Sequence, residues 1–101
     1  MLRAVYQGRR ALKTRTASVY MYDTGVTLRI ENAPEDPYFI EFEDGQKATP
    51  INNVVEIPDE LFQHDGEVEL YLVVKDGESV NTLCAFVIPV LWRPAREQKS
   101  N

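Results

Sequence analysis

A long hairpin pattern in the last third of the chain constrains the fold most strongly. Apolar and other residues alternate over residues 68–74, which is the period of a strand with one buried face. Asp76-Gly77 then provides a tight turn, because glycine adopts a positive φ without steric cost. A second apolar alternation follows over residues 80–90, and its opposite face is apolar as well. We therefore expect this return strand to be central in a sheet or to lie against a partner.

Shorter strand-like segments precede this hairpin. Two alternating segments flank Asp23-Thr24-Gly25, which predicts a second hairpin, and a helical turn is expected after Pro58, which needs no N–H in a first turn. The remaining expected strands are residues 2–6, 38–42 and 54–57. The chain thus predicts an all-β fold, an antiparallel β-sandwich, immunoglobulin-like or related, of about seven strands with one short helical turn near residues 58–62.

The length of 101 residues, 44% of them hydrophobic, fits a single domain with one core. Within it we distinguish a basic N-terminal strand or arm (1–16), a sandwich body (17–92) and a basic C-terminal tail (93–101). The single cysteine, Cys84, excludes an internal disulfide and a multi-cysteine zinc site.

The net charge of −5 hides a division along the chain. Residues 1–15 carry a charge of +5, residues 16–92 a charge of −12, and residues 93–101 a charge of +2. The basic ends can pair with the acidic body of their own copy or of a neighbouring copy. The acidic balance disfavours binding to nucleic acid and to anionic membranes.

Catalytic and metal-binding patterns are missing from the sequence. The only histidine, His64, is surrounded by turn-forming residues, and no glycine-rich phosphate loop, nucleophile elbow or EF-hand spacing is present. We therefore expect no enzyme, no cofactor and no metal site.

Basic and aromatic side chains are the candidate interface residues, because arginine, tyrosine and tryptophan are enriched at protein interfaces. For Tyr20, Tyr22 and Tyr71, the alternative that these side chains complete the sandwich core is equally open. The candidates are Arg9, Arg10, Lys13, Arg15, Tyr20, Tyr22, Tyr71, Trp92, Arg93 and Arg96.

Three segments in the second half of the chain together form a pattern that resembles a known type of domain. They are the segment Ile57-Pro58-Asp59-Glu60-Leu61, the acidic turn Asp76-Gly77-Glu78, and the closing Ile88-Pro89-Val90 with Arg93-Pro94 after it. This pattern resembles a small β-domain of structural proteins from tailed phages and prophages of Gram-positive bacteria, similar to the N-terminal domain of phage baseplate upper proteins. The resemblance covers roughly residues 17–94, with its specific part from Val54 to Pro94. It implies an attachment module and supplies no catalytic residues.

We therefore expect a non-enzymatic structural or adaptor subunit of a phage or prophage particle, at the tail or baseplate. It would assemble through sheet edges, aromatic patches and basic arms with other virion proteins and copies of itself. With no signal peptide at its start, it would be made in the host cytoplasm and reside in the virion. The alternatives are a capsid decoration or head-fibre protein, a small acidic phage-encoded inhibitor of a host defence protein, and a carbohydrate-binding sandwich that uses exposed tyrosine or tryptophan.

Overall fold

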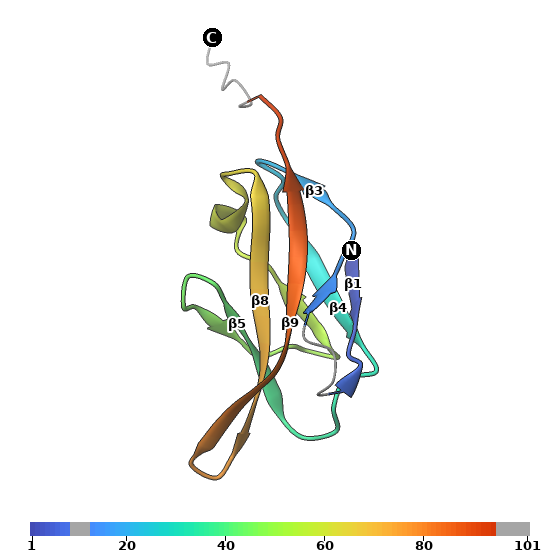
Figure 1. Ribbon diagram of the computed structural model, residues 1–101, viewed down its shortest axis with the longest axis vertical. Coiled ribbons are helices and arrows are strands. Elements are labelled where there is room, and N and C mark those ends of the chain that lie inside the picture. The colour runs from blue at the N-terminus through green and yellow to red at the C-terminus, as the bar shows by residue number, and fades with distance from the viewer. Residues whose placement is uncertain (9–12, 95–101) are drawn as a thin grey trace.

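The computed structural model describes residues 1–8 and 13–94, which form a sandwich of two β-sheets (Figure 1). The smaller sheet has the strand order β1-β4-β7, and the larger has the order β2-β9-β8-β5-β6, with β3 also paired to β9. The smaller sheet consists of β1 (Leu2–Val5), β4 (Thr27–Glu31) and β7 (Val54–Glu56). The larger consists of β2 (Lys13–Arg15), β3 (Val19–Tyr20), β5 (Tyr38–Phe42), β6 (Lys47–Ala48), β8 (Gly66–Asp76) and β9 (Ser79–Leu91). The predicted all-β sandwich is confirmed, and seven of these strands have three or more residues.

The hairpin predicted from residues 68–74 and 80–90 is confirmed, extends over residues 66–91 and dominates the larger sheet. β8 pairs antiparallel with β9 along almost their whole length, and Gly77 takes a φ of 63° in the turn. β9 is central, with β8 on one side and β2 and β3 on the other. Both faces of β9 are apolar, and Ala85 and Val87 of its outer face are buried like the residues of its core face.

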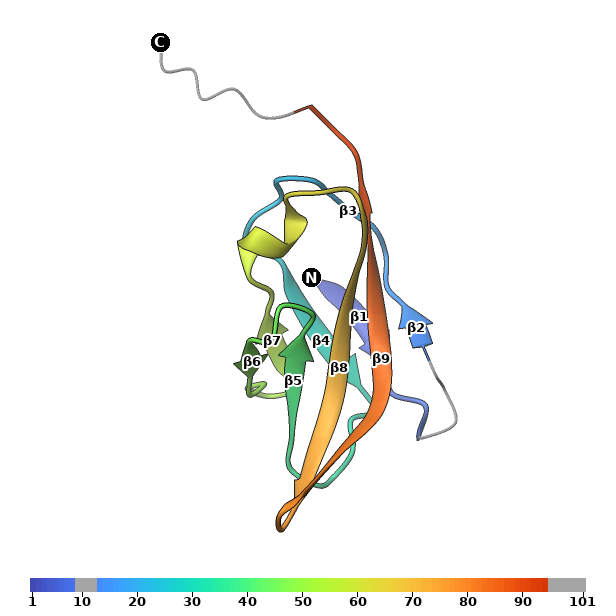
Figure 2. The ribbon, with the colours of Figure 1, turned by 60° about the vertical axis from the view of Figure 1, so that its left-hand side comes forward.

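The N-terminal strands depart from the expected antiparallel pattern. β1 runs parallel to β4, while β2 and β3 run parallel to β9. Figure 2 shows β1 in the smaller sheet and β2 beside β9 in the larger one. Two parallel strands of one sheet need a long crossover connection, which is usually a helix. Between the parallel strands β1 and β4, the chain passes through β2 and β3 of the larger sheet, and this path takes the place of the helix.

The predicted hairpin around Asp23-Thr24-Gly25 is wrong. The segment before it, β3, pairs with β9, whereas the segment after it, β4, pairs with β1 and β7. The turn is therefore a corner between the two sheets. Both segments alternate as a hairpin would, since each has one face in the shared core.

The core lies between the sheets and is closed at one end by the predicted helical turn, η2 (Asp59–Phe62). This 3-10 turn follows Pro58 and places the fully buried Phe62 in the core. The Tyr22 N–H donates a hydrogen bond to the Phe62 carbonyl oxygen at 2.8 Å, so the corner and η2 are joined. No helix among the described residues is long and apolar enough to cross a membrane.

Cys84 lies on the core face of β9, opposite Leu72 of β8. Burial raises the pKa of its thiol to about 11, so only about a thousandth of it is thiolate near pH 8. We expect the native protein to resist a chromogenic thiol reagent at this pH, and the urea-unfolded chain to react at the rate of a free thiol. Native labelling as fast as unfolded labelling would contradict this placement of Cys84.

Candidate protein-binding surface at the end of β3 and β9

Three large, exposed apolar side chains gather where β3 and β9 end. Tyr20 is 50% exposed, Leu91 43% and Trp92 64%. Tyr20 and Leu91 are direct partners in the parallel β3–β9 pairing, and Trp92 follows Leu91 in sequence. We call Tyr20, Leu91 and Trp92 the end patch; the strands β3 and β9, at whose ends these residues lie, are labelled in Figure 1.

The strand period explains why these side chains face outward. Val19 and Val90, the preceding residues, are paired with each other and belong to the buried core. Because successive side chains of a strand point to opposite faces, Tyr20 and Leu91 point away from the core. Apolar residues scattered singly over a surface are ordinary, but here exposed Tyr20 and Leu91 are paired and exposed Trp92 follows Leu91 in the chain, which marks a candidate interface.

Hydrogen bonds hold the backbone beneath the end patch. The Tyr20 N–H donates to Asp23 Oδ2 at 3.0 Å, and the Asp23 N–H donates to the Tyr20 carbonyl oxygen at 3.1 Å. On the β9 side, the Met21 N–H donates to the Leu91 carbonyl oxygen at 2.9 Å. The patch is therefore presented on an ordered backbone, which lowers the entropy that a partner must remove on binding.

Arg93 places a positive charge beside the end patch. One of its terminal nitrogens lies 3.9 Å from Asp23 Oδ1, an ion-pair distance longer than a hydrogen bond. Its Nε and Nη2 atoms have no hydrogen-bond partner among the described residues. Both atoms are buried, so they are not accessible to a partner protein.

Tyr22 and Tyr71, the other two tyrosine candidates, lie apart from the end patch. Tyr22 is half-buried, packs against the core and has a φ of 68°, which matches the core alternative. Tyr71 is half-buried on the outer face of β8, and its hydroxyl donates to Glu69 Oε1 at 2.7 Å. This hydrogen bond raises the pKa of Tyr71.

Lys13 and Arg15 are paired within the chain. The Lys13 ammonium lies 2.8 Å from a Glu69 carboxylate oxygen, and Arg15 is paired with Glu67. The hydrogen bond from Lys13 lowers the pKa of Glu69, and the same contact raises the pKa of Lys13. The basic residues of β2 thus pair with the acidic body of their own copy.

These two ion pairs join β2 to β8 and cross the outer face of β9, which lies between them. Val87, in register with Arg15 on one side and Glu69 on the other, is only 1% exposed although it is outside the core cluster. The long aliphatic parts of lysine and arginine side chains cover apolar surface in this way. The basic residues of β2 therefore serve to cover β9.

The remaining candidates Arg9, Arg10 and Arg96 lie outside the described residues. Among the described residues, no group of three or more histidine, cysteine or acidic side chains is placed to hold a metal ion. His64 is exposed in the segment between η2 and β8.

Sequence reasoning missed Leu91 as part of the surface and missed Glu67 and Glu69 as the partners of β2. The signals were available in the alternation: Leu91 is on the outer face of the return strand beside Trp92, and the two glutamates share the outer face of the preceding strand. No family model matches the chain, and no curated protein matches it either.

Proposed function

We propose that this chain is a non-enzymatic structural or adaptor subunit of a phage or prophage particle, at the tail or baseplate, that docks to other proteins of the particle through the end patch. The single observation that supports docking is the pairing of exposed Tyr20 with exposed Leu91, which exposed Trp92 follows in the chain.

The chemistry of the patch favours a protein partner. Tryptophan, tyrosine and arginine are the residues most enriched at positions that dominate binding energy, and Trp92, Tyr20 and Arg93 lie at one end of the sandwich. Aromatic rings bury a large area while fixing few rotatable bonds. The positive charge of Arg93 stays close to Asp23, so the apolar and aromatic side chains carry the docking in this proposal.

The assignment to a phage particle rests on the sequence resemblance to the attachment domain of baseplate proteins. The intramolecular pairing of Lys13 and Arg15 changes how such a subunit would assemble. With these charges used inside the chain, we assign the main contact to the aromatic end patch and not to the basic residues of β2.

Mass spectrometry of purified particles tests this proposal. We expect the chain at a stoichiometric copy number in particles purified from the host, and in the tail fraction after heads and tails are separated. A chain confined to the head fraction would identify a decoration or head-fibre protein. Absence from particles, with recovery on a host defence protein, would overturn the structural role.

A further inference from the structure

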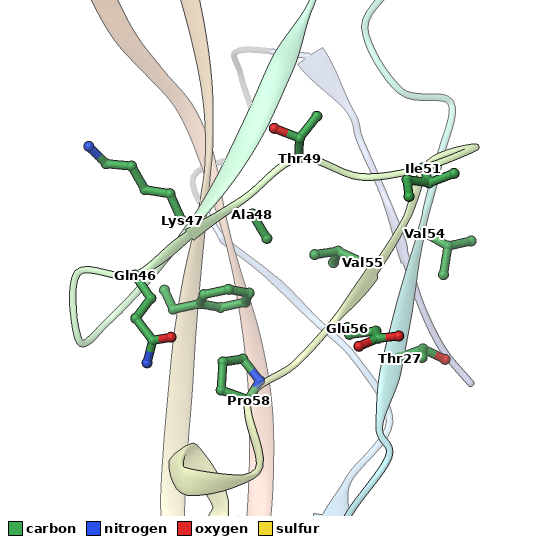
Figure 3. Close-up of a pocket in the computed structure, with 11 residues that line it drawn as sticks. Thr27, Gln46, Lys47, Ala48, Thr49, Ile51, Val54, Val55, Glu56 and Pro58 are labelled. Atoms are coloured by element: carbon green, nitrogen blue, oxygen red, sulfur yellow. The ribbon is translucent and has the colours of Figure 1, made fainter.

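A second candidate surface lies between β6, an edge strand of the larger sheet, and β7, an edge strand of the smaller sheet. A cleft of about 560 Å³ opens there between the edges of the two sheets. Phe42 and Val55, both in the core, line it from inside (Figure 3), and exposed Ile51 stands at its mouth. The cleft is therefore an apolar hollow flanked by two strand edges.

The β6 edge presents free main-chain groups to this cleft. The Phe42 N–H donates to the Gln46 carbonyl oxygen at 2.8 Å, and Ile40 is in register with Ala48. Hydrogen-bonded and non-hydrogen-bonded pairs alternate in an antiparallel ladder. The N–H and C=O groups of Lys47 and Thr49 consequently point away from β5, toward the open edge.

The facing β7 edge is nearly closed to pairing. The Ile57 N–H donates to Val26 and the Ile30 N–H donates to Asn53, so the odd-numbered residues of β7 face β4. Val54 turns the other way, but both its main-chain groups are bonded to Ile51, at 2.9 and 3.0 Å. A strand entering the cleft therefore finds two residues with free main-chain groups, Lys47 and Thr49, on the β6 side, and only Glu56 on the β7 side.

The charge in the cleft comes from Glu56. Its exposed carboxylate makes no ion pair or hydrogen bond with another described residue, and it lines the cleft. The only other charged residue of the lining, Lys47, directs its ammonium away from the cleft (Figure 3), and this group lies 5.8 Å from the centre of the Phe39 ring. The cleft thus offers an apolar floor and one uncompensated negative charge.

From these features we propose that the β6–β7 cleft binds an extended segment of a partner protein, which adds to the β6 edge as a further strand. The segment carries an apolar side chain over Phe42 and Val55 and a basic side chain near Glu56, which points to the opposite face of β7 from Val55. Main-chain hydrogen bonds to Lys47 and Thr49 set its register, as in other cases of strand addition. The site is independent of the end patch and of the particle in which the chain functions.

Binding of two short peptides tests the site. The probes are fluorescein-labelled Thr-Val-Thr-Lys-Thr-Val-Thr and the same peptide with glutamate in place of lysine. We expect saturable binding of the lysine peptide, measured by fluorescence anisotropy, and about tenfold weaker binding of the glutamate peptide. The variant Glu56→Lys reverses this preference, whereas Glu78→Lys, the same charge change in the exposed β8–β9 turn, leaves it unchanged.

Amide hydrogen exchange distinguishes a peptide that pairs with β6 as a strand from a peptide that binds in the cleft through its apolar side chains alone. Saturation with the lysine peptide is expected to slow exchange of the Lys47 and Thr49 amides, which face the open edge. The proposal is wrong if the lysine peptide does not bind up to about 1 mM, if Glu56→Lys leaves the preference unchanged, or if these amides are not protected.

Discussion

Replacing Phe86 with alanine is expected to remove a large part of the stability of this domain. Phe86 is fully buried at the middle of β9, in register with Thr14 of β2 and Leu70 of β8. Loss of a buried phenylalanine side chain costs about 3–5 kcal/mol, because apolar burial is lost and a cavity is left. Domains of this size are stable by about 5–15 kcal/mol in total.

Urea unfolding followed by far-UV circular dichroism, which reports the loss of the strands, measures this effect. The matched control is Phe39→Ala, because Phe39 is half-buried on the outer face of β5, outside the core cluster. We expect this control to cost about 1–2 kcal/mol. If the two variants are equally destabilised, Phe86 is not at the centre of the core.

The larger part of the fold is encoded locally and was predictable. In β8 and β9 the alternation of apolar residues marks two strands, and Asp76-Gly77 marks the turn between them. Strands joined by a tight turn pair with each other, so pattern and turn together determine the pairing. The same local logic located η2, because Pro58 is compatible with the start of a helical turn.

The N-terminal pairing could not be predicted, because alternation reports which face of a strand is buried and not which strand is its neighbour. β2 reads Lys13-Thr14-Arg15 and contains no apolar residue. Its place beside β9 depends on tertiary contacts, including the ion pairs to Glu67 and Glu69. The corner at Asp23-Thr24-Gly25 was mistaken for a hairpin for the same reason.

Tyr20 and Trp92 of the end patch were predicted as interface candidates, but Leu91 was not, and the sequence did not show that the three lie at one place. Tyr20, Trp92 and Arg93 are candidates from residue type alone, although more than seventy positions separate Tyr20 from Trp92 in the chain. The parallel register of β3 and β9 brings them together. That register follows from the path of the N-terminal segment between the sheets, for which the sequence has no local signal.

The variant Trp92→Ala is expected to exclude the chain from particles while leaving its fold intact. Truncation of a tryptophan at the centre of an interface costs about 2–4 kcal/mol of binding free energy, a loss of about 30- to 1000-fold in affinity. Because Trp92 is mostly exposed in the free protein, we expect the free energy of unfolding to change by no more than about 0.5 kcal/mol. The copy number per particle, measured by quantitative mass spectrometry in a host that lacks the wild-type copy, reports incorporation.

Two further variants separate the end patch from apolar exposure in general. Tyr20→Ala removes the neighbouring ring and is expected to reduce incorporation as Trp92→Ala does. Val80→Ala shortens another exposed apolar residue on β9, near the β8–β9 turn and at the opposite end of the strand, and is expected to be incorporated normally. Full incorporation of Trp92→Ala, or equal loss with Val80→Ala, would contradict docking through the end patch. Because the two test residues come from β3 and from the segment after β9, loss with both would also locate the partner across the parallel junction that joins these strands.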